Sequence, residues 1–203
     1  MTLETSVGEK FLSVGTQDDL RQGKNAELIT APLFGRQHEL ALNRRLFQSY
    51  GAPATLTAVN TTYTGHLLWN PVGSGVNLVL CEVDLAVTVT SATMTGIVLA
   101  SAAQATTPTS VTAVERQGNM FLGGAAGAVL AYKVATLTAA GTAFKHLMHN
   151  TAAIATTGVD RVNVDLGDGV ICPPGYWVAL AAIGAASAAA AVTSSFIYAE
   201  IPE

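Results

Sequence analysis

Charged and aromatic residues are scarce in this chain. Of its 203 residues, 12% are Asp, Glu, Lys or Arg and 6% are aromatic, whereas half are hydrophobic and most of these are Ala or Val. Ordinary soluble domains carry about 25% charged residues, and a surface with few charges favours association. We therefore expect a subunit that buries much of its outer surface against copies of itself or against a partner.

Long hydrophobic runs are also missing. The most apolar stretch, residues 176–192, is rich in alanine, is interrupted by Gly184 and Ser187, and is shorter than the roughly 20 strongly apolar residues of a membrane span. The first 14 residues include two glutamates and a lysine and have no apolar core of a signal peptide. The expectation is a protein made in a cytoplasm, without a membrane partner.

Cysteine occurs only twice, as Cys81 and Cys172, and both lie in apolar, strand-like contexts. In a reducing compartment this favours two buried free thiols over a disulfide. The two residues are also too far apart in the sequence for the disulfide of an immunoglobulin domain, and no tryptophan lies suitably between them.

Charge is distributed unevenly along the chain. Residues 1–50 hold 12 of the 24 charged side chains, six of each sign, and residues 51–203 hold four basic and eight acidic ones. The first 25 residues are polar, contain three glycines and show no sustained periodicity, which is typical of an irregular arm. We place a boundary here, with an N-terminal arm or strap at 1–50 and a β-sandwich domain at 51–203.

The second half of the arm carries weak structural signals. Residues 26–31 favour a short strand, and residues 33–50 fit a helical turn or an extended strap equally well. Arg36, Arg44 and Arg45 form the only basic concentration, for which a solvated face is the first interpretation and contact with an acidic neighbouring subunit the alternative. We expect the arm to contribute little to the core and to dock on another subunit.

From Gly51 onwards the chain is a series of short β-type runs. Gly, Pro, Ser and Thr separate the runs, and no amphipathic helix intervenes, which predicts an all-β, antiparallel β-sandwich. About eight main strands after an arm favour a jelly-roll-like order, with an immunoglobulin-like order as the alternative. The Ala-rich segments 100–105 and 185–191 are expected to be loops or strand extensions, with a short helix as the alternative. The predicted strands are 54–59, 63–69, 76–89, 93–100, 110–115, 128–137, 143–148, 161–166, 170–172, 176–183 and 192–200.

The stretch 67–87 defines the centre of the predicted sandwich. Asn70-Pro71 ends one strand, and Gly73 and Gly75 permit a sharp turn into a long second strand. On that strand, alternation predicts one uniformly apolar core face and one face that changes from apolar to acidic. The predicted core face comprises Val79, Cys81, Val83, Leu85 and Val87, and the other face comprises Leu78, Leu80, Glu82, Asp84 and Ala86.

No catalytic constellation emerges from the sequence. Gly73-Ser74-Gly75 lacks the spacing and the lysine of a phosphate loop, and Ser74 does not sit in a nucleophile elbow. His38 and His66 have no evident catalytic partner, and His66 is expected to be hydrogen-bonded locally. We therefore predict no enzyme activity, no catalytic residue and no cofactor.

Two groups of residues remain as candidate binding sites. His146 and His149, with Asp160 and Asp165 downstream, are interpreted as structural, because a strand would place the two histidines on opposite faces. Asp160, Asp165 and Asp168 are candidates for calcium ligands, although they lack the alternating ligands of an EF-hand and no metal site is assigned. Four aromatic residues fit a core or an interface, with a sugar-binding platform as the alternative: Trp69, Tyr176, Trp177 and Tyr198.

Three motifs resemble those of virion structural proteins of tailed bacteriophages. They are Asn70-Pro71-Val-Gly73-Ser74-Gly75 with the strand that follows, the segment Cys172-Pro173-Pro174-Gly175-Tyr176-Trp177, and the closing Tyr198-Ala-Glu-Ile-Pro202. The resemblance covers roughly residues 65–202 in layout, and its motifs are turns and strands, so it brings no functional residues with it. It implies a β-sandwich subunit of a phage particle without enzymatic activity.

From this resemblance and the composition we expect a capsid decoration or cement subunit. It would stabilise the head as a homo-oligomer, with a trimer favoured, and would contact other virion proteins such as the major capsid protein. Nucleic acid and membrane are not expected as partners, and the location is the virion, after synthesis in the host cytoplasm. The alternative is a receptor- or glycan-binding module of a tail or fibre.

Overall fold

The structure, a computed structural model, describes residues 36–58, 60–89, 94–149, 160–184 and 191–203. The unit Leu40–Glu203 contains all the strands, and no helix in the described ranges is long and apolar enough to cross a membrane. The elements in chain order are α1 (Arg36–Leu42), β1 (Leu46–Thr55), β2 (Thr62–Asn70), β3 (Val76–Val89), β4 (Met94–Ala103), β5 (Thr109–Ala113), β6 (Arg116–Asn119), β7 (Leu130–Thr136), β8 (Thr142–His149), β9 (Asp160–Cys172), β10 (Tyr176–Gly184) and β11 (Ala191–Pro202).

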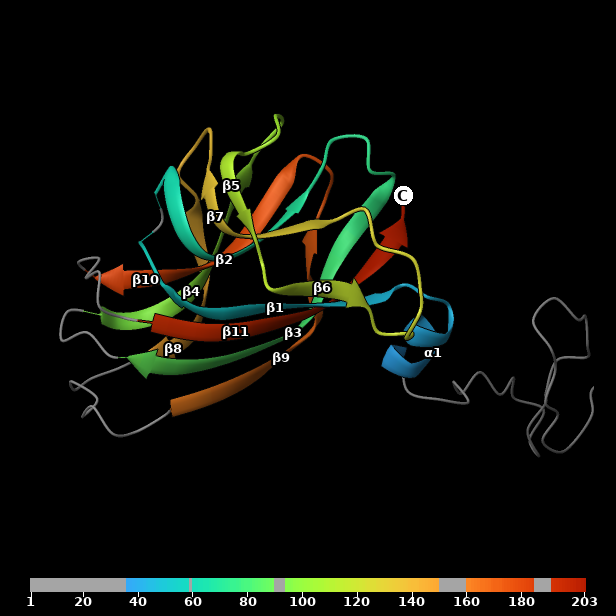
Figure 1. The fold of residues 1–203 in the computed structure, drawn as a ribbon, viewed down its shortest axis with the longest axis horizontal. Coiled ribbons are helices and arrows are strands. Elements are labelled where there is room, and N and C mark those ends of the chain that lie inside the picture. The colour runs from blue at the N-terminus through green and yellow to red at the C-terminus, as the bar shows by residue number, and fades with distance from the viewer. Residues whose placement is uncertain (1–35, 59, 90–93, 150–159, 185–190) are drawn as a thin grey trace, which may run out of the picture. The chain divides into compact units, whose positions relative to one another are not determined.

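The strands form two antiparallel sheets that pack face to face, which confirms the predicted all-β sandwich (Figure 1). The five-stranded sheet has the order β6-β1-β11-β3-β9, and the six-stranded sheet has the order β5-β7-β2-β10-β4-β8. The antiparallel pairs β1 with β11, β2 with β10, β3 with β9, and β4 with β8 are nested within one another along the chain. Nested pairs shared between two sheets are the arrangement of a jelly roll.

Strands β5, β6 and β7 are an insertion between β4 and β8. β6 adds to the free side of β1 in one sheet, and β7 adds to the free side of β2 in the other. The insertion therefore widens both sheets at the same side of the sandwich and leaves β8 and β9 as the outermost strands on the opposite side.

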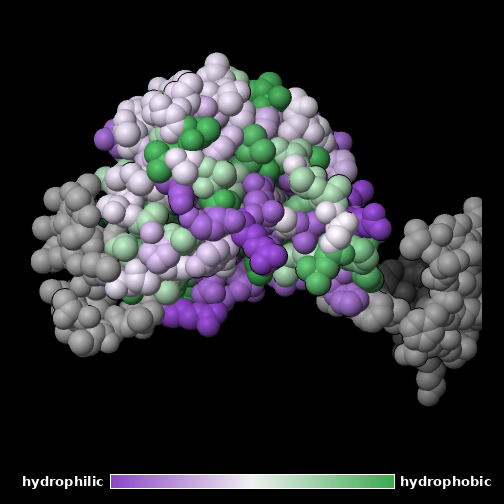
Figure 2. Space-filling model, viewed as in Figure 1, coloured by the Kyte–Doolittle hydropathy of each residue, from purple (hydrophilic) through white to green (hydrophobic). Residues whose placement is uncertain are grey.

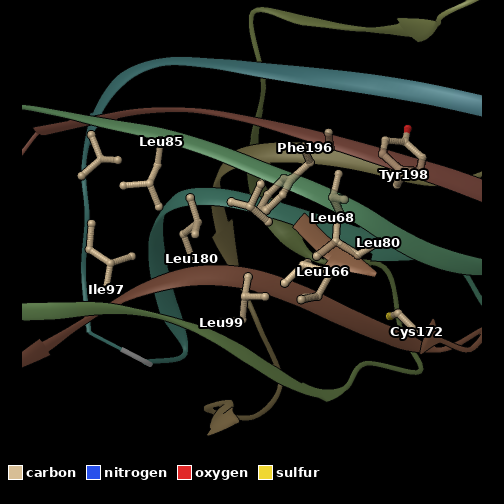
Figure 3. Packing of buried hydrophobic residues seen from close by; sticks show 14 of the residues in the cluster. Leu68, Leu80, Leu85, Ile97, Leu99, Leu166, Cys172, Leu180, Phe196 and Tyr198 are labelled. Atoms are coloured by element: carbon tan, nitrogen blue, oxygen red, sulfur yellow. The ribbon is translucent and has the colours of Figure 1, made fainter. Parts of the chain in front are cut away.

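The main core lies between the two sheets. Leu85 and Phe196 from the five-stranded sheet face Leu99 and Leu180 from the six-stranded sheet (Figure 3). Cys172 also lies in this core, and both cysteines are buried thiols outside any disulfide, as the sequence predicts. Burial raises the pKa of the Cys172 thiol to about 12, because the thiolate is poorly solvated there.

A β-bulge in β3 corrects the predicted core face. Against β11, Leu80 and Glu82 pair with the consecutive residues Tyr198 and Ile197, so Cys81 is the extra residue of a bulge. Against β9 the register shifts at the same place, and residues 166–169 of β9 lie opposite Cys81. Leu78 and Leu80 therefore face the main core, together with Val83, Leu85 and Val87 beyond the bulge. The assignment of Val79 and Cys81 to that core was wrong, because both lie in a cluster on the other face of the sheet with Leu46 and Ala199, against which Leu40 and Ala41 pack.

The six-stranded sheet also has a second buried cluster on its opposite face. It takes the alternate residues of β2, β4 and β10, including Leu67, Val98 and Ala179, together with Ala135 of β7 and Leu137 directly after β7. Tyr63 lies in this cluster and its hydroxyl donates to the carbonyl of Leu180 at 2.6 Å. This second core explains why so many strands are apolar on both faces.

The boundary predicted at residue 50 divides a strand of the sandwich. β1 begins at Leu46, and Leu46, Phe47 and Ser49 are buried in the unit that holds the sheets. Residues 46–50 thus belong to the sandwich, and the expectation that they contribute little to its core was wrong. Residues 1–35 and the Ala-rich residues 185–190 lie outside the described ranges, whereas Ala100–Ala103 extend β4 as a strand.

Candidate functional site

Three of the four aromatic residues considered for a sugar platform are core residues. Trp69, Trp177 and Tyr198 are 4%, 1% and 0% exposed, and only Tyr176, at 41%, reaches solvent. The Trp69 indole donates to the carbonyl of Gln104 at 3.1 Å. The Tyr198 ring stacks on Phe47 with 5.7 Å between centroids. These four residues therefore do not form a platform.

The buried histidine joins the two sheets. His66 on β2 lies between two hydroxyls of the other sheet, with Nε2 2.9 Å from Ser49 Oγ and Nδ1 2.8 Å from Ser194 Oγ. Burial lowers the pKa of His66 to about 3, against the opposing effects of the Ser194 contact and the charge of Glu115. Because Ser49 is fully buried, its hydroxyl cannot meet a substrate, and the cluster is structural.

The candidate metal ligands are only partly described. Asp165 Oδ1 accepts a hydrogen bond from the backbone N–H of Gly167 at 2.8 Å, so it caps a local turn. The side chains of His149, Asp160 and Asp168 lie outside the described residues, so the structure does not test the candidate calcium ligands. His38 and His146 are exposed. No three His, Cys, Asp or Glu side chains in the described part of the chain are grouped in a way that could hold a metal ion.

A shallow hollow on the outer face of the five-stranded sheet contains an exposed aromatic ring. The register places Tyr50, Ser195 and Asp84 in one row across β1, β11 and β3. Arg161 on β9 clamps Asp84 with two hydrogen bonds, Nε to Oδ1 at 3.0 Å and Nη2 to Oδ2 at 2.8 Å. The hollow has a volume of ≈ 150 Å³, and Thr193 and Ser194 also line it. Figure 2 shows hydrophilic residues along β9 at one margin of this face.

An apolar tip follows β6. We define it as Met120, Phe121 and Leu122, which are 37%, 38% and 90% exposed. The N–H of Gly124 donates to the carbonyl of Phe121 at 2.8 Å, and Gly123 has a φ of 85°, the conformation that the third position of a type II turn requires. Leu122 is therefore held at the apex of a closed turn. Figure 2 shows hydrophobic residues gathered over this loop and the end of α1.

Polar contacts fix the tip to the sandwich. The N–H of Met120 donates to the carbonyl of Leu46 at 2.9 Å, and Asn119 Nδ2 donates to the carbonyl of Arg44 at 2.7 Å. Asn119 Oδ1 in turn accepts the N–H of Phe121 at 2.8 Å. The Arg44 guanidinium lies over the Phe121 ring, 5.1 Å from its centroid. Arg44, one of the three arginines of the basic concentration, therefore packs on an apolar surface.

The far end of the same loop is anchored by a buried carboxylate. Glu200 is 8% exposed, and its two oxygens accept the backbone N–H groups of Ala128 and Val129, each at 2.9 Å. A Cβ at Gly127 would lie 2.1 Å from Glu200 Oε1, so this position has room only for glycine. Gln117 Oε1 holds the start of β7 by accepting the N–H of Ala131 at 3.0 Å. Hydrogen bonds at both ends of the loop therefore hold the tip in a defined conformation.

An apolar groove lies at the other side of the sandwich, where the edge strands β8 and β9 leave the seam between the sheets open. It has a volume of ≈ 300 Å³ and is lined by Ser101, Phe144, Gly169, Val170, Ile171, Cys172 and Val178. Phe144 and Ile171 are 48% and 61% exposed at its rim. Large apolar side chains that stay in water at a concave surface are a common mark of an interface.

Few features of the sequence indicate these surfaces. Tyr50 falls within the predicted arm at 1–50, although the structure places it on β1. The available signal was local: three large apolar residues, 120–122, stand directly before a Gly-Gly pair that favours a turn. The groove depends on how β8 and β9 meet in space, which no local pattern contains.

Comparisons with known proteins identify no relative. No protein-family model matches the chain, and neither the curated proteins nor the solved structures contain a match. The architecture that the chain does show is an all-β sandwich with jelly-roll strand order.

Proposed function

We propose that the protein is a structural subunit of a bacteriophage particle, a capsid decoration or cement subunit that stabilises the head by packing against copies of itself and against the major capsid protein. The observation that carries the proposal is the apolar tip, in which a fixed turn holds Leu122 90% exposed. The phage context comes from the resemblance of the turn and strand motifs at residues 70–75, 172–177 and 198–202.

The energetics of the tip favour a protein partner. Removing a large apolar side chain from water contributes roughly 1.5–3 kcal/mol, and Met120, Phe121 and Leu122 all remain partly or largely in water. Because hydrogen bonds already fix the turn, little conformational entropy is lost when a partner covers it. Such preorganised apolar contact points suit permanent assembly.

The jelly-roll order is compatible with this role and does not by itself select it. The same fold serves both capsid and lectin domains. What favours assembly is the combination of few charges with apolar residues at opposite margins of the sandwich, the tip beyond β6 and the groove beside β9.

Sedimentation velocity of the purified full-length protein tests the self-association. The expected result is a stable oligomer at micromolar concentration, with three copies favoured, and dissociation in the variant Leu122→Asp. The matched control is Val72→Asp, because Val72 is also exposed, at 62%, but belongs to neither the tip nor the groove lining. A wild-type protein that sediments as a monomer, with and without phage particles, contradicts the proposal.

The second candidate function is a glycan- or receptor-binding module, and the hollow at Tyr50 is the observation that favours it. An exposed ring can stack on the apolar face of a sugar, while Asp84, Arg161 and the hydroxyls of Thr193 and Ser195 can bond its hydroxyl groups. Binding on a glycan array that Tyr50→Ala abolishes and Tyr176→Ala preserves supports this function. Tyr176 is the matched control because the two rings are 41% and 43% exposed.

A further inference from the structure

We propose that the hollow at Tyr50, on the outer face of the five-stranded sheet, binds one uncharged pyranose ring of a glycan. The inference rests on the second candidate function, because it names the class of sugar for the same hollow. The apolar tip and the apolar groove take no part in it, since neither contributes to the lining.

Short side chains between two large ones form the hollow. Its lining on the central strands β11 and β3 includes Thr193, Ser195 and Ala86, which share the outer face. Tyr50 on β1 and Arg161 on β9 flank them, and the four strands are consecutive in the sheet (Figure 1). Because neighbouring strands lie about 4.8 Å apart, β1 and β9 are roughly 14 Å apart across the sheet. The floor is therefore low, and its two walls are an aromatic ring and a guanidinium group.

The size of the hollow fits one ring rather than a longer oligosaccharide. Its volume is ≈ 150 Å³, whereas pockets that enclose a drug-sized ligand measure about 300–1,000 Å³. A hollow of this volume covers one face of a single ring and leaves the rest of the glycan in water. A site of this kind binds each ring weakly, and repeated copies on an oligomer raise the overall affinity.

The Tyr50 ring supplies the apolar wall. It is 43% exposed, although register partners on both sides, Arg116 of β6 and Ser195 of β11, fix its backbone within the sheet. One face of a pyranose ring consists largely of C–H groups, which pack on an aromatic ring and remove apolar surface of both from water. Little order has to be gained on binding, because the sheet already holds the backbone that carries the ring.

Polar groups on the floor and the opposite wall meet the hydroxyl groups of the sugar. Within the described ranges, the hydroxyls of Thr193 and Ser195 make no hydrogen bond to another residue. Arg161 holds Asp84 through Nε and Nη2, so the carboxylate is fixed in orientation while its oxygens keep lone pairs and Nη1 keeps its donors. A sugar hydroxyl both donates and accepts, so this mixture of donors and acceptors suits a polyol.

The charges of this face favour an uncharged sugar. Arg161 and Asp84 neutralise each other in a salt bridge. One row further along the same face, Glu82 and Asp165 are register partners, and Arg116 lies on the other side of Tyr50. Among these described residues, three carboxylates face two guanidinium groups. A sugar that carries a carboxylate or a phosphate is therefore disfavoured by like charge.

Saturation-transfer difference NMR of the full-length protein tests the inference. The neutral probes are the methyl glycosides of glucose, galactose and mannose. The charged probe is methyl glucuronide, which differs from methyl glucoside by a carboxylate in place of the primary alcohol. At least one neutral probe should give a signal, and methyl glucuronide should give none.

Variants of the aromatic wall assign the signal to this hollow. Tyr50→Ala should abolish it, whereas Tyr50→Phe should keep it, because the phenyl ring still stacks on the sugar. Tyr176→Ala is the matched control, since Tyr50 and Tyr176 are 43% and 41% exposed, and it should leave the signal unchanged. Circular dichroism should show the same fold for all three variants.

Asp84→Asn tests the role of the ion pair. The change leaves the Arg161 guanidinium without its carboxylate, so the hollow gains a positive charge. This variant should lose signal from the neutral probe and gain signal from methyl glucuronide, which can form a charge-assisted hydrogen bond with the free guanidinium. Failure of methyl glucuronide to bind this variant would overturn the argument from charge.

The outcomes separate this inference from the function on which it rests. A neutral probe that binds the wild type but not Tyr50→Ala, with no signal from methyl glucuronide, supports the inference. Methyl glucuronide that binds the wild type as well as the neutral probes do, and is lost in Tyr50→Ala, overturns the uncharged class while glycan binding stands. Binding that survives Tyr50→Ala overturns the assignment to this hollow. If no probe binds and a glycan array is also blank, the second candidate function is overturned with the inference.

Discussion

The side-chain nitrogen of Asn70 donates a hydrogen bond of 3.0 Å to the carbonyl oxygen of Cys172, a residue 102 positions later in the chain. The same nitrogen donates to the carbonyl of Val76 at 2.8 Å, and Asn70 Oδ1 accepts the hydroxyl of Ser74 at 2.7 Å. Asn70 is fully buried. One side chain thus fixes the turn that precedes β3 and ties it to the turn that precedes β10.

Replacement of Asn70 by leucine should destabilise the protein by about 2–4 kcal/mol. The change preserves approximate size but removes the Asn70 donor from the carbonyl of Cys172 and leaves the carbonyl of Val76 with only the 3.3 Å contact from Ser74 Oγ, and each unsatisfied buried group costs about 1–3 kcal/mol. Urea unfolding followed by circular dichroism measures the difference. Ser74→Ala, which removes only the hydroxyl contact, should cost about 1 kcal/mol, and equal effects of the two changes would contradict this role for Asn70.

The turn itself was predictable, but its link to Cys172 was not. Asn70-Pro71 and the glycines at 73 and 75 identify the turn from local chemistry, and Gly73 and Gly75 have φ values of 75° and 70°. The partner of the Asn70 side chain depends on the register of β2 with β10, in which Asn70 lies opposite Tyr176. Long-range register is a property of the assembled sheets.

Acid should destabilise the protein through His66. Its pKa in the folded state is about 3, below the usual 6.5, so the unfolded chain takes up a proton first as the pH falls. The stability from the neutral ring is complete above pH 6.5 and is lost progressively towards pH 3, by up to about 1.4 kcal/mol per pH unit. Urea unfolding at pH 7.0, 6.0 and 5.0 measures this slope.

The control for the acid effect is His66→Gln, which does not titrate. Its stability should be lower than that of the wild type at pH 7 and should change little between pH 7 and pH 5. A wild-type protein that is equally stable at pH 7 and pH 5 would show that the unfolded and folded chains bind the same number of protons in this range, against the burial of a neutral ring.

The two tryptophans should respond differently to replacement by phenylalanine. Trp69 and Trp177 are register partners, but the Trp69 indole donates to Gln104, whereas the Trp177 indole N–H is buried without an acceptor among the described residues. Trp69→Phe should therefore cost about 1 kcal/mol more than Trp177→Phe, since both lose similar packing and only one loses a hydrogen bond. Guanidinium unfolding of the two variants gives the comparison, and a larger cost for Trp177→Phe would contradict the assignment.

Truncation should locate the start of the sandwich. A chain that begins at Leu40 keeps all of β1 and should fold with a cooperative melting transition. A chain that begins at Gly51 lacks Leu46 and Phe47, which are 2% and 4% exposed, and the first residues that pair with β11, so it should be insoluble or unfolded. A stable fold in the shorter chain would restore the boundary at residue 50.

The fold class followed from the sequence, because alternating apolar residues and turn signals are local. The bulge at Cys81 did not, since a regular alternation from Val79 to Val87 is the simplest pattern that the residues allow, and the shift appears only in the pairing with β9 and β11. The burial of Trp69 and Trp177 was also not predictable, because the second core buries a face that a simple two-layer sandwich leaves open to solvent. The surfaces that carry the proposals lie where strands from distant parts of the chain end together.

The position of the protein in a phage particle tests the central claim most directly. Cryo-electron microscopy of the particle that carries this chain should show the sandwich at regular positions on the capsid lattice, in contact with the major capsid protein, with the tip of residues 120–122 covered by a neighbouring subunit. Density for the sandwich only on a tail or fibre, or its absence from the particle, would contradict the account.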